Sequence, residues 1–213
     1  MKIIDSEYAN QKSFLNGLVT LGGLSECGKT SAGVHLESIG FDRIKIIQIE
    51  REMMLERKFD LSNGMADYHF IELYKGEPHH VFKEFLIRLI DRIKANNKKY
   101  VTIESLYRAP LGAFLKAELQ EKAVDIYIYA PIEVRAQREL IKINQNNASN
   151  DLPKIEFADV LKRIEQKDLF KTRHNAFECR DIADVVIDNG TNTSYDDFIS
   201  ELNSIVKTKL SFK

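Results

Sequence analysis

The sequence predicts an α/β protein in which a largely parallel sheet is joined by crossover helices. Short apolar runs alternate along the chain with longer stretches whose apolar residues recur at helical spacing. A glycine-rich string of the pattern G-x-x-x-x-G-K-[ST] spans residues 23–30, directly after the first apolar run and before a helical stretch. Because 213 residues suffice for one well-buried core, we expect a single domain over residues 1–213.

Five short apolar runs are the expected strands, since each is rich in β-branched or aromatic residues. They are Leu18 to Leu21, Ile44 to Ile49, Tyr100 to Glu104, Val124 to Tyr129 and Ala183 to Ile187.

Helices are expected between these runs and after the last one. The first ends at Gly40, which suits a left-handed stop, and Pro131 suits the start of another. The expected helices are Lys29 to Gly40, His80 to Ala95, Leu111 to Lys122, Ile132 to Ile143, Glu156 to Arg173 and Tyr195 to Val206. Residues 50–77 lack a clear strand and would pass over the carboxyl edge of the sheet, where ligands bind in open α/β folds. The polar stretch Asn144 to Asp151 predicts a mobile loop.

Composition, charge and cysteine count argue against a nucleic-acid-binding, membrane or disulfide-rich secreted protein. Apolar residues make up 44% and charged residues 30% of the chain, and the formal net charge is −1, which gives no overall attraction to nucleic acid or to an anionic membrane. The two cysteines, Cys27 and Cys179, do not suggest a disulfide framework. No apolar run could cross a bilayer, and the N-terminus does not read as a signal peptide. We therefore expect a cytoplasmic protein without a membrane or nucleic-acid partner, as a monomer or a homodimer.

The string at residues 23–30 predicts a phosphate-binding loop, the Walker A motif. Its glycines allow a tight turn that points backbone N–H groups at phosphate oxygens, and the following helix adds the positive end of its dipole. Lys29 would reach the β and γ phosphates of ATP, and the Thr30 hydroxyl would hold Mg²⁺. A plain glycine-rich turn is the alternative, but it leaves the order of residues 28–30 unexplained. The expected ATP contacts here are Gly23, Leu24, Ser25, Glu26, Cys27, Gly28, Lys29, Thr30 and Ser31.

Four charged residues outside the loop are candidates for the chemistry. Glu104 ends the third expected strand beside the loop, where a carboxylate can orient the water shell of Mg²⁺. Arg108 follows on the same edge and could hold a second anionic group. Arg135 and Arg138 share one face of an expected helix and could neutralise charge on a transferring phosphoryl group. The alternative for each is an ordinary solvated charge.

Two classes of function, a guanine-nucleotide switch and a nucleic-acid-binding protein, are disfavoured because their motifs are missing. No N-K-x-D string for guanine recognition occurs, because the nearest approach, residues 97–100, ends in Tyr100. No basic stripe with interleaved aromatic residues marks a nucleic-acid surface.

In these motifs the chain resembles the small P-loop kinases of nucleoside monophosphates and of dephospho-coenzyme A. The likeness is most specific at residues 22–30, at Glu104 to Arg108 and at Ala130 to Arg138. The segment Arg163 to Gln166, which reads R-I-E-Q, and the A-D-x-V-I-x-N string at Ala183 to Asn189 are similar to the closing region of dephospho-coenzyme A kinases.

The resemblance implies a P-loop NTPase fold of three α/β/α layers with a five-stranded parallel sheet. It also implies an acceptor-binding insertion at about residues 50–77 and a lid at about residues 137–154. The loop of Asn189, Gly190 and Thr191 would lie against the adenine. Arg51 would match the arginine that holds the acceptor phosphate. Lys142 is a possible substitute for a missing lid arginine, and Arg163 is a further lid candidate.

Two departures from these kinases keep alternatives open. The aspartate pair expected after the second strand is replaced by Gln48, Ile49, Glu50 and Arg51, and Glu26 brings a carboxylate close to the phosphates. The leading hypothesis is an ATP- and Mg²⁺-dependent kinase acting on a small, phosphorylated acceptor such as a nucleoside monophosphate. If the acceptor atom is a hydroxyl oxygen, Glu50 is the best available base. The alternatives are a kinase of dephospho-coenzyme A or of another metabolite hydroxyl, and a regulatory protein that binds ATP without transferring phosphate.

Overall fold

The computed structural model describes residues 12–61, 66–150 and 152–212. Its five strands form one parallel sheet in the order β2-β3-β1-β4-β5, which confirms the predicted fold class. The strands are β1 Gly17–Gly22, β2 Asp42–Lys45, β3 Tyr100–Leu106, β4 Ala123–Tyr129 and β5 Val185–Asp188. The helices are α2 Lys29–Ser38, α3 Ile46–Glu56, α4 Ala66–Leu73, α5 Pro78–Ala95, α6 Ala109–Leu119, α7 Ile132–Ser149, α8 Phe157–Arg173, α9 Glu178–Asp181 and α10 Tyr195–Leu210, with a 3-10 turn at Gln120–Lys122.

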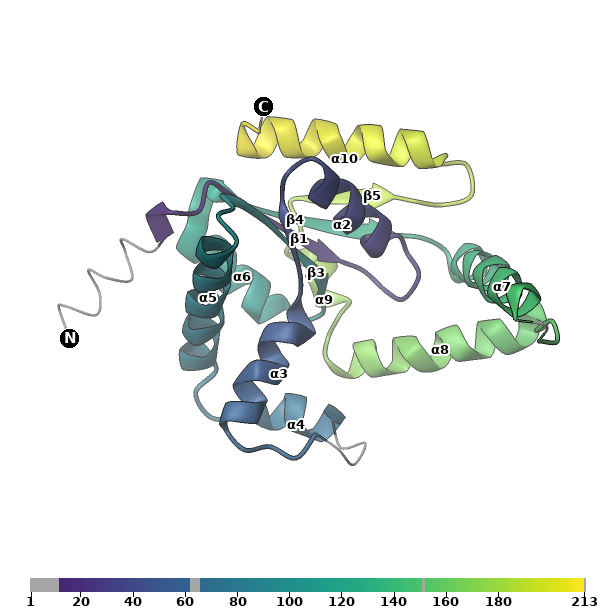
Figure 1. Cartoon of the computed structure of the whole chain (residues 1–213), viewed down its shortest axis with the longest axis horizontal. Helices are drawn as coiled ribbons and strands as arrows, with labels where there is room; N and C mark the ends of the chain where they lie inside the picture. Colours follow the sequence, from purple (N-terminus) through teal and green to yellow (C-terminus); the bar gives the residue numbers. More distant parts are fainter. Residues whose placement is uncertain (1–11, 62–65, 151, 213) are drawn as a thin grey trace.

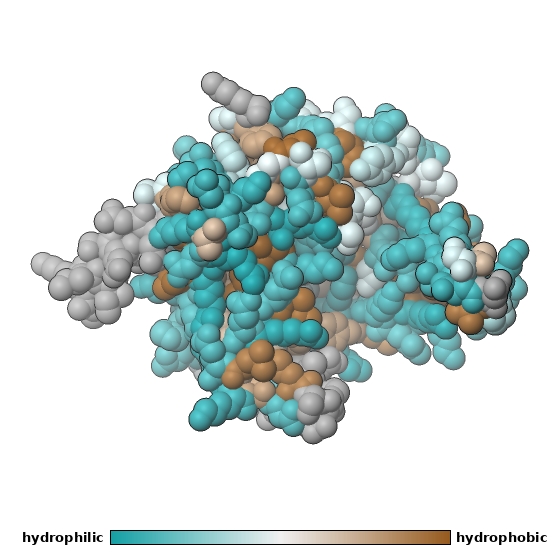
Figure 2. Space-filling model, in the orientation of Figure 1, coloured by the Kyte–Doolittle hydropathy of each residue, from teal (hydrophilic) through white to brown (hydrophobic). Residues whose placement is uncertain are grey.

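Helices cover both faces of the sheet and make a three-layer molecule (Figure 1). The apolar sides of α2 and α10 pack on one face with Val19, Leu21 and Ile126. The apolar sides of α3, α5 and α6 pack on the other face with Leu18 and Ile103. Polar side chains cover much of the visible surface, with apolar patches between them (Figure 2).

The second predicted strand, Ile44 to Ile49, is wrong over its last four residues. Strand β2 ends at Lys45, and Ile46 begins helix α3. Ile46, Ile49 and Met53 are buried at helical spacing, so the apolar run belongs to a helix face for most of its length. The Gln48 side chain accepts a hydrogen bond from the Lys45 N–H at 3.0 Å and thereby closes the helix start.

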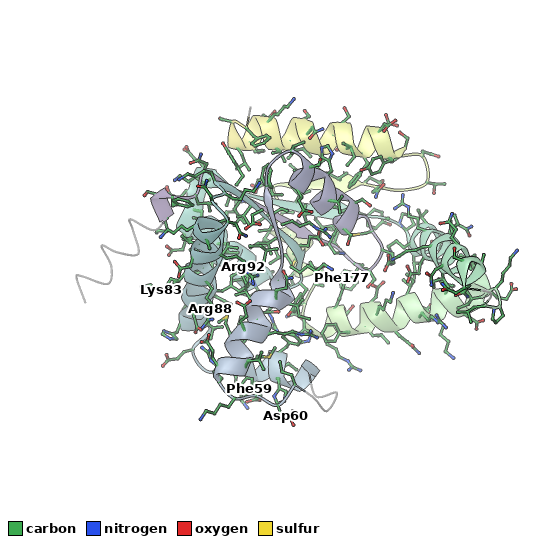
Figure 3. All side chains as sticks on the ribbon, viewed as in Figure 1. Phe59, Asp60, Lys83, Arg88, Arg92 and Phe177 are labelled. Atoms are coloured by element: carbon green, nitrogen blue, oxygen red, sulfur yellow. The ribbon has the colours of Figure 1, made fainter. Side chains whose placement is uncertain are left out.

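Helix α3 extends to Glu56, into the interval 50–77 for which the sequence predicted no strand, and it packs beside α5. Arg88 and Arg92 project from α5 (Figure 3). Arg92 donates to Glu52 of α3 at 2.6 Å, and Arg88 donates to Glu56. Part of the interval 50–77, residues 62–65, lies outside the described residues.

The predicted mobile loop at residues 144–151 is wrong in most of its length, because α7 continues to Ser149. Asn144 accepts a hydrogen bond from the Ile155 N–H at 2.8 Å and donates one to the Ile155 carbonyl at 3.2 Å. Asn147 donates to the Pro153 carbonyl at 2.7 Å. These amides join the end of α7 to the segment that leads into α8. The polar residues of this stretch therefore stabilise the turn of a helical hairpin. Asp151 lies outside the described residues.

The described part of the chain holds no helix with the length and apolarity needed to span a bilayer.

A buried carboxylate in the middle of the sheet predicts a pH dependence of stability. Asp125 of β4 accepts a hydrogen bond from the Thr20 hydroxyl of β1. Its second oxygen is buried without a hydrogen-bond partner among residues 12–61, 66–150 and 152–212. Burial raises the pKa of Asp125 from 3.8 to about 6.

The folded state therefore binds more protons than the unfolded state between about pH 4 and pH 6, and stability falls as the pH rises through this window. Lowering the pH from 7 to 5 is expected to gain about 1 kcal/mol from this group. Asp125→Asn should remove that gain. Urea unfolding of both proteins at the two pH values measures it, and an equal pH response in the two proteins would contradict the assignment.

Candidate active site

The glycine-rich string forms the turn between β1 and α2, as predicted. Gly28 has φ 118° at the start of α2, and a Cβ atom there would meet the Asn189 amide nitrogen at 2.5 Å. The same amide donates to the Cys27 carbonyl at 2.9 Å, so the loop after β5 is fastened directly to the glycine loop. Glycine is required at position 28 for its backbone angle and for this close approach.

The Lys29 ammonium lies inside the loop. Its Nζ atom donates to the Gly23 carbonyl at 2.9 Å and to the Leu24 carbonyl, and it lies 3.4 Å from the Cys27 sulfur. A buried cation held by carbonyl oxygens at the base of a loop is suited to receive an anion.

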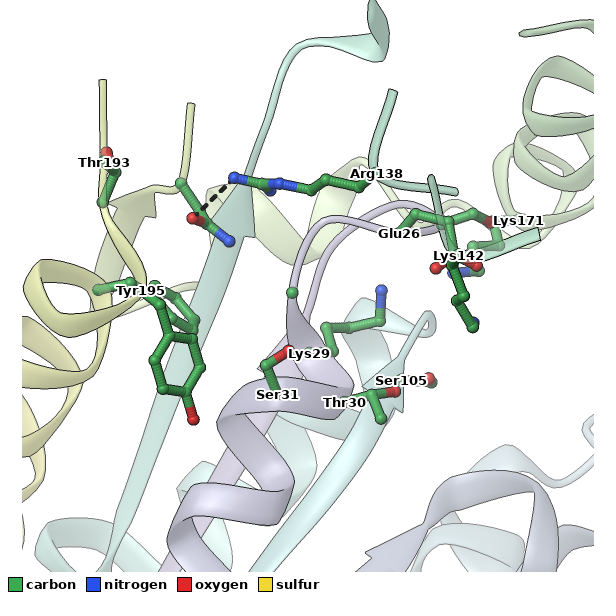
Figure 4. Close-up of a pocket in the computed structure, with 14 residues that line it drawn as sticks. Glu26, Lys29, Thr30, Ser31, Ser105, Arg138, Lys142, Lys171, Thr193 and Tyr195 are labelled. Carbon is green, nitrogen blue, oxygen red and sulfur yellow. Dashed lines mark hydrogen bonds between the residues drawn. The ribbon is translucent and has the colours of Figure 1, made fainter. Parts of the chain in front are cut away.

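A cavity of about 680 Å³ lies above this loop (Figure 4). Its charged lining consists of four basic side chains and one acid. They are Lys29, Arg138, Lys142, Lys171 and Glu26. The other lining residues are Ser25, Gly28, Thr30, Ser31, Ser105, Asn189, Thr193, Tyr195 and Phe198. The excess of positive charge favours a polyanionic ligand.

Arg138 reaches the cavity from α7. One of its terminal nitrogens lies 3.2 Å from the Asn189 side-chain oxygen and 3.5 Å from the Gly190 carbonyl. The other is buried without a hydrogen-bond partner in the described part of the chain, and burial lowers the pKa of the side chain. An anion in the cavity would supply the missing partner.

Of the other residues predicted to contact the nucleotide, only some line the cavity. Gly23, Leu24 and Cys27 form the loop but do not line the cavity, and neither Gly190 nor Thr191 does. On the side toward α10 the cavity is lined instead by Thr193 and Tyr195. The lid candidate Lys142 lines the cavity with an exposed side chain, 3.6 Å from Glu139.

Glu104 does not line the cavity, where its predicted role would place it. Its carboxylate is buried, pairs with Arg43 of β2 and lies against Gly33 of α2, where a Cβ atom would meet it at 1.9 Å. The pairing register of β3 shifts beside this residue, because Gly22 pairs with Leu106 directly after Leu21 pairs with Glu104. This bulge leaves Ser105, with φ 67°, to face the cavity instead.

Arg135 also differs from its predicted role, since it lies beneath the glycine loop. It donates to the Ala130 and Ser25 carbonyls, both at 3.0 Å, and pairs with Asp168 of α8 at 2.6 Å. Asp168 in turn accepts a hydrogen bond from the Ser25 N–H at 3.0 Å. We call Ser25, Arg135 and Asp168 the loop clamp. Its Nε and one terminal nitrogen are thus engaged by these buried partners, and Arg135 does not line the cavity.

Sequence reasoning missed Lys171. This α8 residue lines the cavity, and burial followed by the charge of Lys29 lowers its pKa to about 7. The helix was predicted, but its sequence does not show which of its many charged residues face the loop. Lys167, one turn earlier, bonds Glu139 at 3.1 Å and Glu26 at 3.4 Å, so the acid of the glycine loop has a basic partner.

Two of the three predicted acceptor residues come together. Arg108 lies 3.6 Å from the Glu50 carboxylate, which accepts hydrogen bonds from the Tyr74 hydroxyl at 2.6 Å and from the Tyr107 hydroxyl. Burial raises the pKa of Glu50. Because Glu50 is fully buried, it does not reach the cavity as a base.

Arg51 and Arg163 lie away from the cavity. Arg51 is exposed on α3 and does not line the cavity above the glycine loop. Arg163 lines a separate hollow between α7 and α8, next to Ile143 and Asn147. Helical phase is consistent with both positions, since each arginine directly neighbours a buried residue, Glu50 on α3 and Ile164 on α8.

No known protein family and no curated protein matches this sequence. Among solved structures, TT1252 from Thermus thermophilus superposes with a TM-score of 0.51 at 15% identity, over 90% of this chain and 97% of that one. An uncharacterized protein from Eubacterium ventriosum gives a TM-score of 0.55 at 10% identity, over 92% and 99%. Shikimate kinase from Acinetobacter baumannii, in complex with shikimate, gives 0.44 at 21% identity, over 94% and 97%.

The first two similarities concern the fold alone, because identities this low carry no information about a reaction. The third superposition is too loose to support an argument. The sheet order and the glycine loop between β1 and α2 define a three-layer α/β/α fold of the P-loop class.

Proposed function

We propose that this protein is a phosphotransferase that binds ATP in the cavity above the glycine loop and passes its γ-phosphoryl group to a small acceptor. The observation that carries the proposal is the buried Lys29 ammonium, held by loop carbonyls at the floor of a cavity with three further basic side chains. The loop N–H groups and Lys29 would bind the donor phosphates. Arg138, Lys142 and Lys171 would neutralise charge on the transferring group.

The described lining of the cavity offers hydroxyl ligands for a magnesium ion but no cluster of carboxylates. The described residues hold no cluster of three or more His, Cys, Asp or Glu side chains suited to a metal. Thr30 and Ser105 bring two hydroxyl groups to the cavity, and Mg²⁺ in nucleotide sites takes most of its ligands from phosphates and water. We therefore propose Thr30 and Ser105 as the protein side of the site, in place of Thr30 and Glu104. The ion would supply charge neutralisation on the phosphates when bound.

The acceptor atom is proposed to be a phosphate oxygen. Such an oxygen is ionised at neutral pH and needs no general base, and no carboxylate other than Glu26 lines the cavity among the described residues. The Glu26 carboxylate is engaged by Lys167. This arrangement favours a phosphorylated acceptor over an alcohol acceptor.

The experiment is to measure ADP release with Mg-ATP and a panel of nucleoside monophosphates, phosphorylated metabolites and metabolite alcohols, together with calorimetric ATP binding. ADP release that depends on one member of the panel supports the proposal. Tight ATP binding without turnover across the panel would favour the regulatory alternative. Absence of ATP binding would overturn the assignment of the cavity.

The lowered pKa of Lys171 leads us to expect that ATP binding depends on pH. Its pKa of about 7 lies below the ordinary value for lysine, so a large fraction is neutral above pH 7, and binding phosphates would restore its proton. Between pH 8 and pH 6 we expect up to about tenfold tighter ATP binding from this group alone. Lys171→Arg should bind tightly at both pH values. Calorimetry on wild type and this variant separates the effect from the titration of ATP itself, and the same pH response in both would refute it.

A further inference from the structure

The cavity above the glycine loop has two chemically different ends. Toward α7 and α8 its lining includes the ammonium groups of Lys142 and Lys171, and toward α10 it includes the rings of Tyr195 and Phe198. In Figure 4 the two lysines and Tyr195 lie on opposite sides of Lys29. The charged end suits phosphates, whereas a flat nucleobase gains most by stacking on an aromatic ring. The base of a bound nucleotide is therefore expected on the α10 side.

The Tyr195 ring is open to a ligand. Tyr195 begins α10 and is 59% exposed, and among the described residues its ring takes part in no aromatic pair. Phe198, three residues later on the same side of α10, is buried in the core, and a Cβ atom at Gly28 would lie 3.6 Å from its ring. Phe198 thus closes the cavity beside the glycine loop, and Tyr195 offers an uncovered ring at its rim.

The loop after β5 presents few fixed hydrogen-bonding groups to a base. Asn189 contributes the one amide side chain in the described lining, and both of its ends have protein partners. Its nitrogen donates to the Cys27 carbonyl at 2.9 Å, and its oxygen accepts from Arg138 at 3.2 Å. Gly190 and Thr191 do not line the cavity. This amide is therefore engaged in holding the loops together.

The remaining polar groups on this side are hydroxyls. Those of Ser31 and Tyr195 can each donate or accept a hydrogen bond, and the Thr193 hydroxyl donates to the Asp188 carbonyl at 3.0 Å. The carboxylate of Glu26 lies on the lysine side of the cavity (Figure 4). Bases differ in which edge positions donate and which accept, so a site must hold its own donors and acceptors fixed to distinguish them. Hydroxyls that rotate to suit either pattern do not meet this requirement.

We propose that the donor site selects the triphosphate and not the base, so that its substrate class is nucleoside triphosphates in general, with the base stacked on Tyr195. Stacking on an aromatic side chain tolerates every base, because every base has a π-face. The inference rests on the phosphotransferase function proposed above. The bond that breaks joins the γ-phosphorus to the β,γ-bridging oxygen, the bond that forms joins this phosphorus to the acceptor oxygen, and the nucleoside diphosphate leaves with the electron pair. The base takes no part in this exchange.

The test is calorimetry on the full-length protein with the magnesium complexes of ATP, GTP, CTP, UTP and inorganic tripolyphosphate. For wild type we expect the four nucleotide dissociation constants to agree within about fivefold. Tyr195→Leu removes the ring and should weaken all four by about 3- to 20-fold, with tripolyphosphate binding unchanged. Tyr195→Phe keeps the ring and should bind all four as wild type does. Phe177→Leu, at an exposed ring that does not line the cavity, is the matched control.

The outcomes separate this inference from the proposed function. Failure of wild type to bind ATP would defeat the function itself. If ATP or another nucleotide binds more than about 30-fold tighter than the rest, the function stands and the inference is refuted, because a preference of that size needs fixed hydrogen bonds to the base. Unchanged nucleotide binding in Tyr195→Leu would place the base elsewhere, and an equal loss of tripolyphosphate binding would show that Tyr195 acts through the fold. A loss confined to the four nucleotides, with Phe177→Leu unaffected, supports the inference.

Discussion

Replacing Lys29 with methionine is expected to lower kcat for ADP release by at least about 100-fold, the usual cost of removing one preorganised donor to a developing negative charge. The ammonium is held by the carbonyls of Gly23 and Leu24 at the cavity floor, so its position is fixed before any ligand arrives. Methionine retains much of the side-chain length and removes the charge. Steady-state kinetics, with the acceptor that the panel identifies, measure the effect.

Lys207→Met provides the control for this variant. It makes the same substitution at an exposed position on α10, so its kinetics should equal those of wild type. Circular dichroism and the unfolding midpoint establish that both variants are folded. ADP release by the folded Lys29→Met protein at more than a tenth of the wild-type rate would show that phosphoryl transfer does not depend on this loop.

The parts of the site that the sequence predicted are those set by local chemistry. Residues 23–30 require glycines, a lysine and a hydroxyl at fixed spacing, and the strand and helix on either side follow from the apolar pattern. The loop therefore lies where it was expected. Gly28 also has a role that its spacing did not reveal, since it makes room for the amide of Asn189.

The parts that the sequence did not predict depend on tertiary geometry. The choice between Glu104 and Ser105 is decided by a single register shift between β1 and β3, and alternation along the strand does not reveal such a shift. The boundary after Lys45 depends on the burial of the first turn of α3, because an apolar run of this length fits either a strand or a helix. The roles of Arg135 and Lys171 depend on how α7 and α8 pack on the loop, which no spacing within either helix determines.

Removing the acid of the loop clamp is expected to cost about 3–5 kcal/mol of stability, because Asp168→Ala would leave the buried Arg135 charge without its partner. The Ser25 N–H would lose its acceptor at the same time. The free energy of unfolding in urea measures the loss. Calorimetry should also show weaker ATP binding, since Ser25 belongs to the loop that receives the phosphates.

Two companion variants separate the clamp from a general weakening of α8. Lys167→Met removes the neighbouring residue, whose ion pairs are partly exposed, and should cost less than about 1 kcal/mol. The double variant Arg135→Met, Asp168→Leu removes both buried charges and should regain much of the stability lost in Asp168→Ala. Its ATP binding should stay weak, because neither new side chain can hold the Ser25 backbone. A double variant that recovered stability and ATP affinity together would show that the clamp contributes packing only, and that the glycine loop holds its shape without these hydrogen bonds.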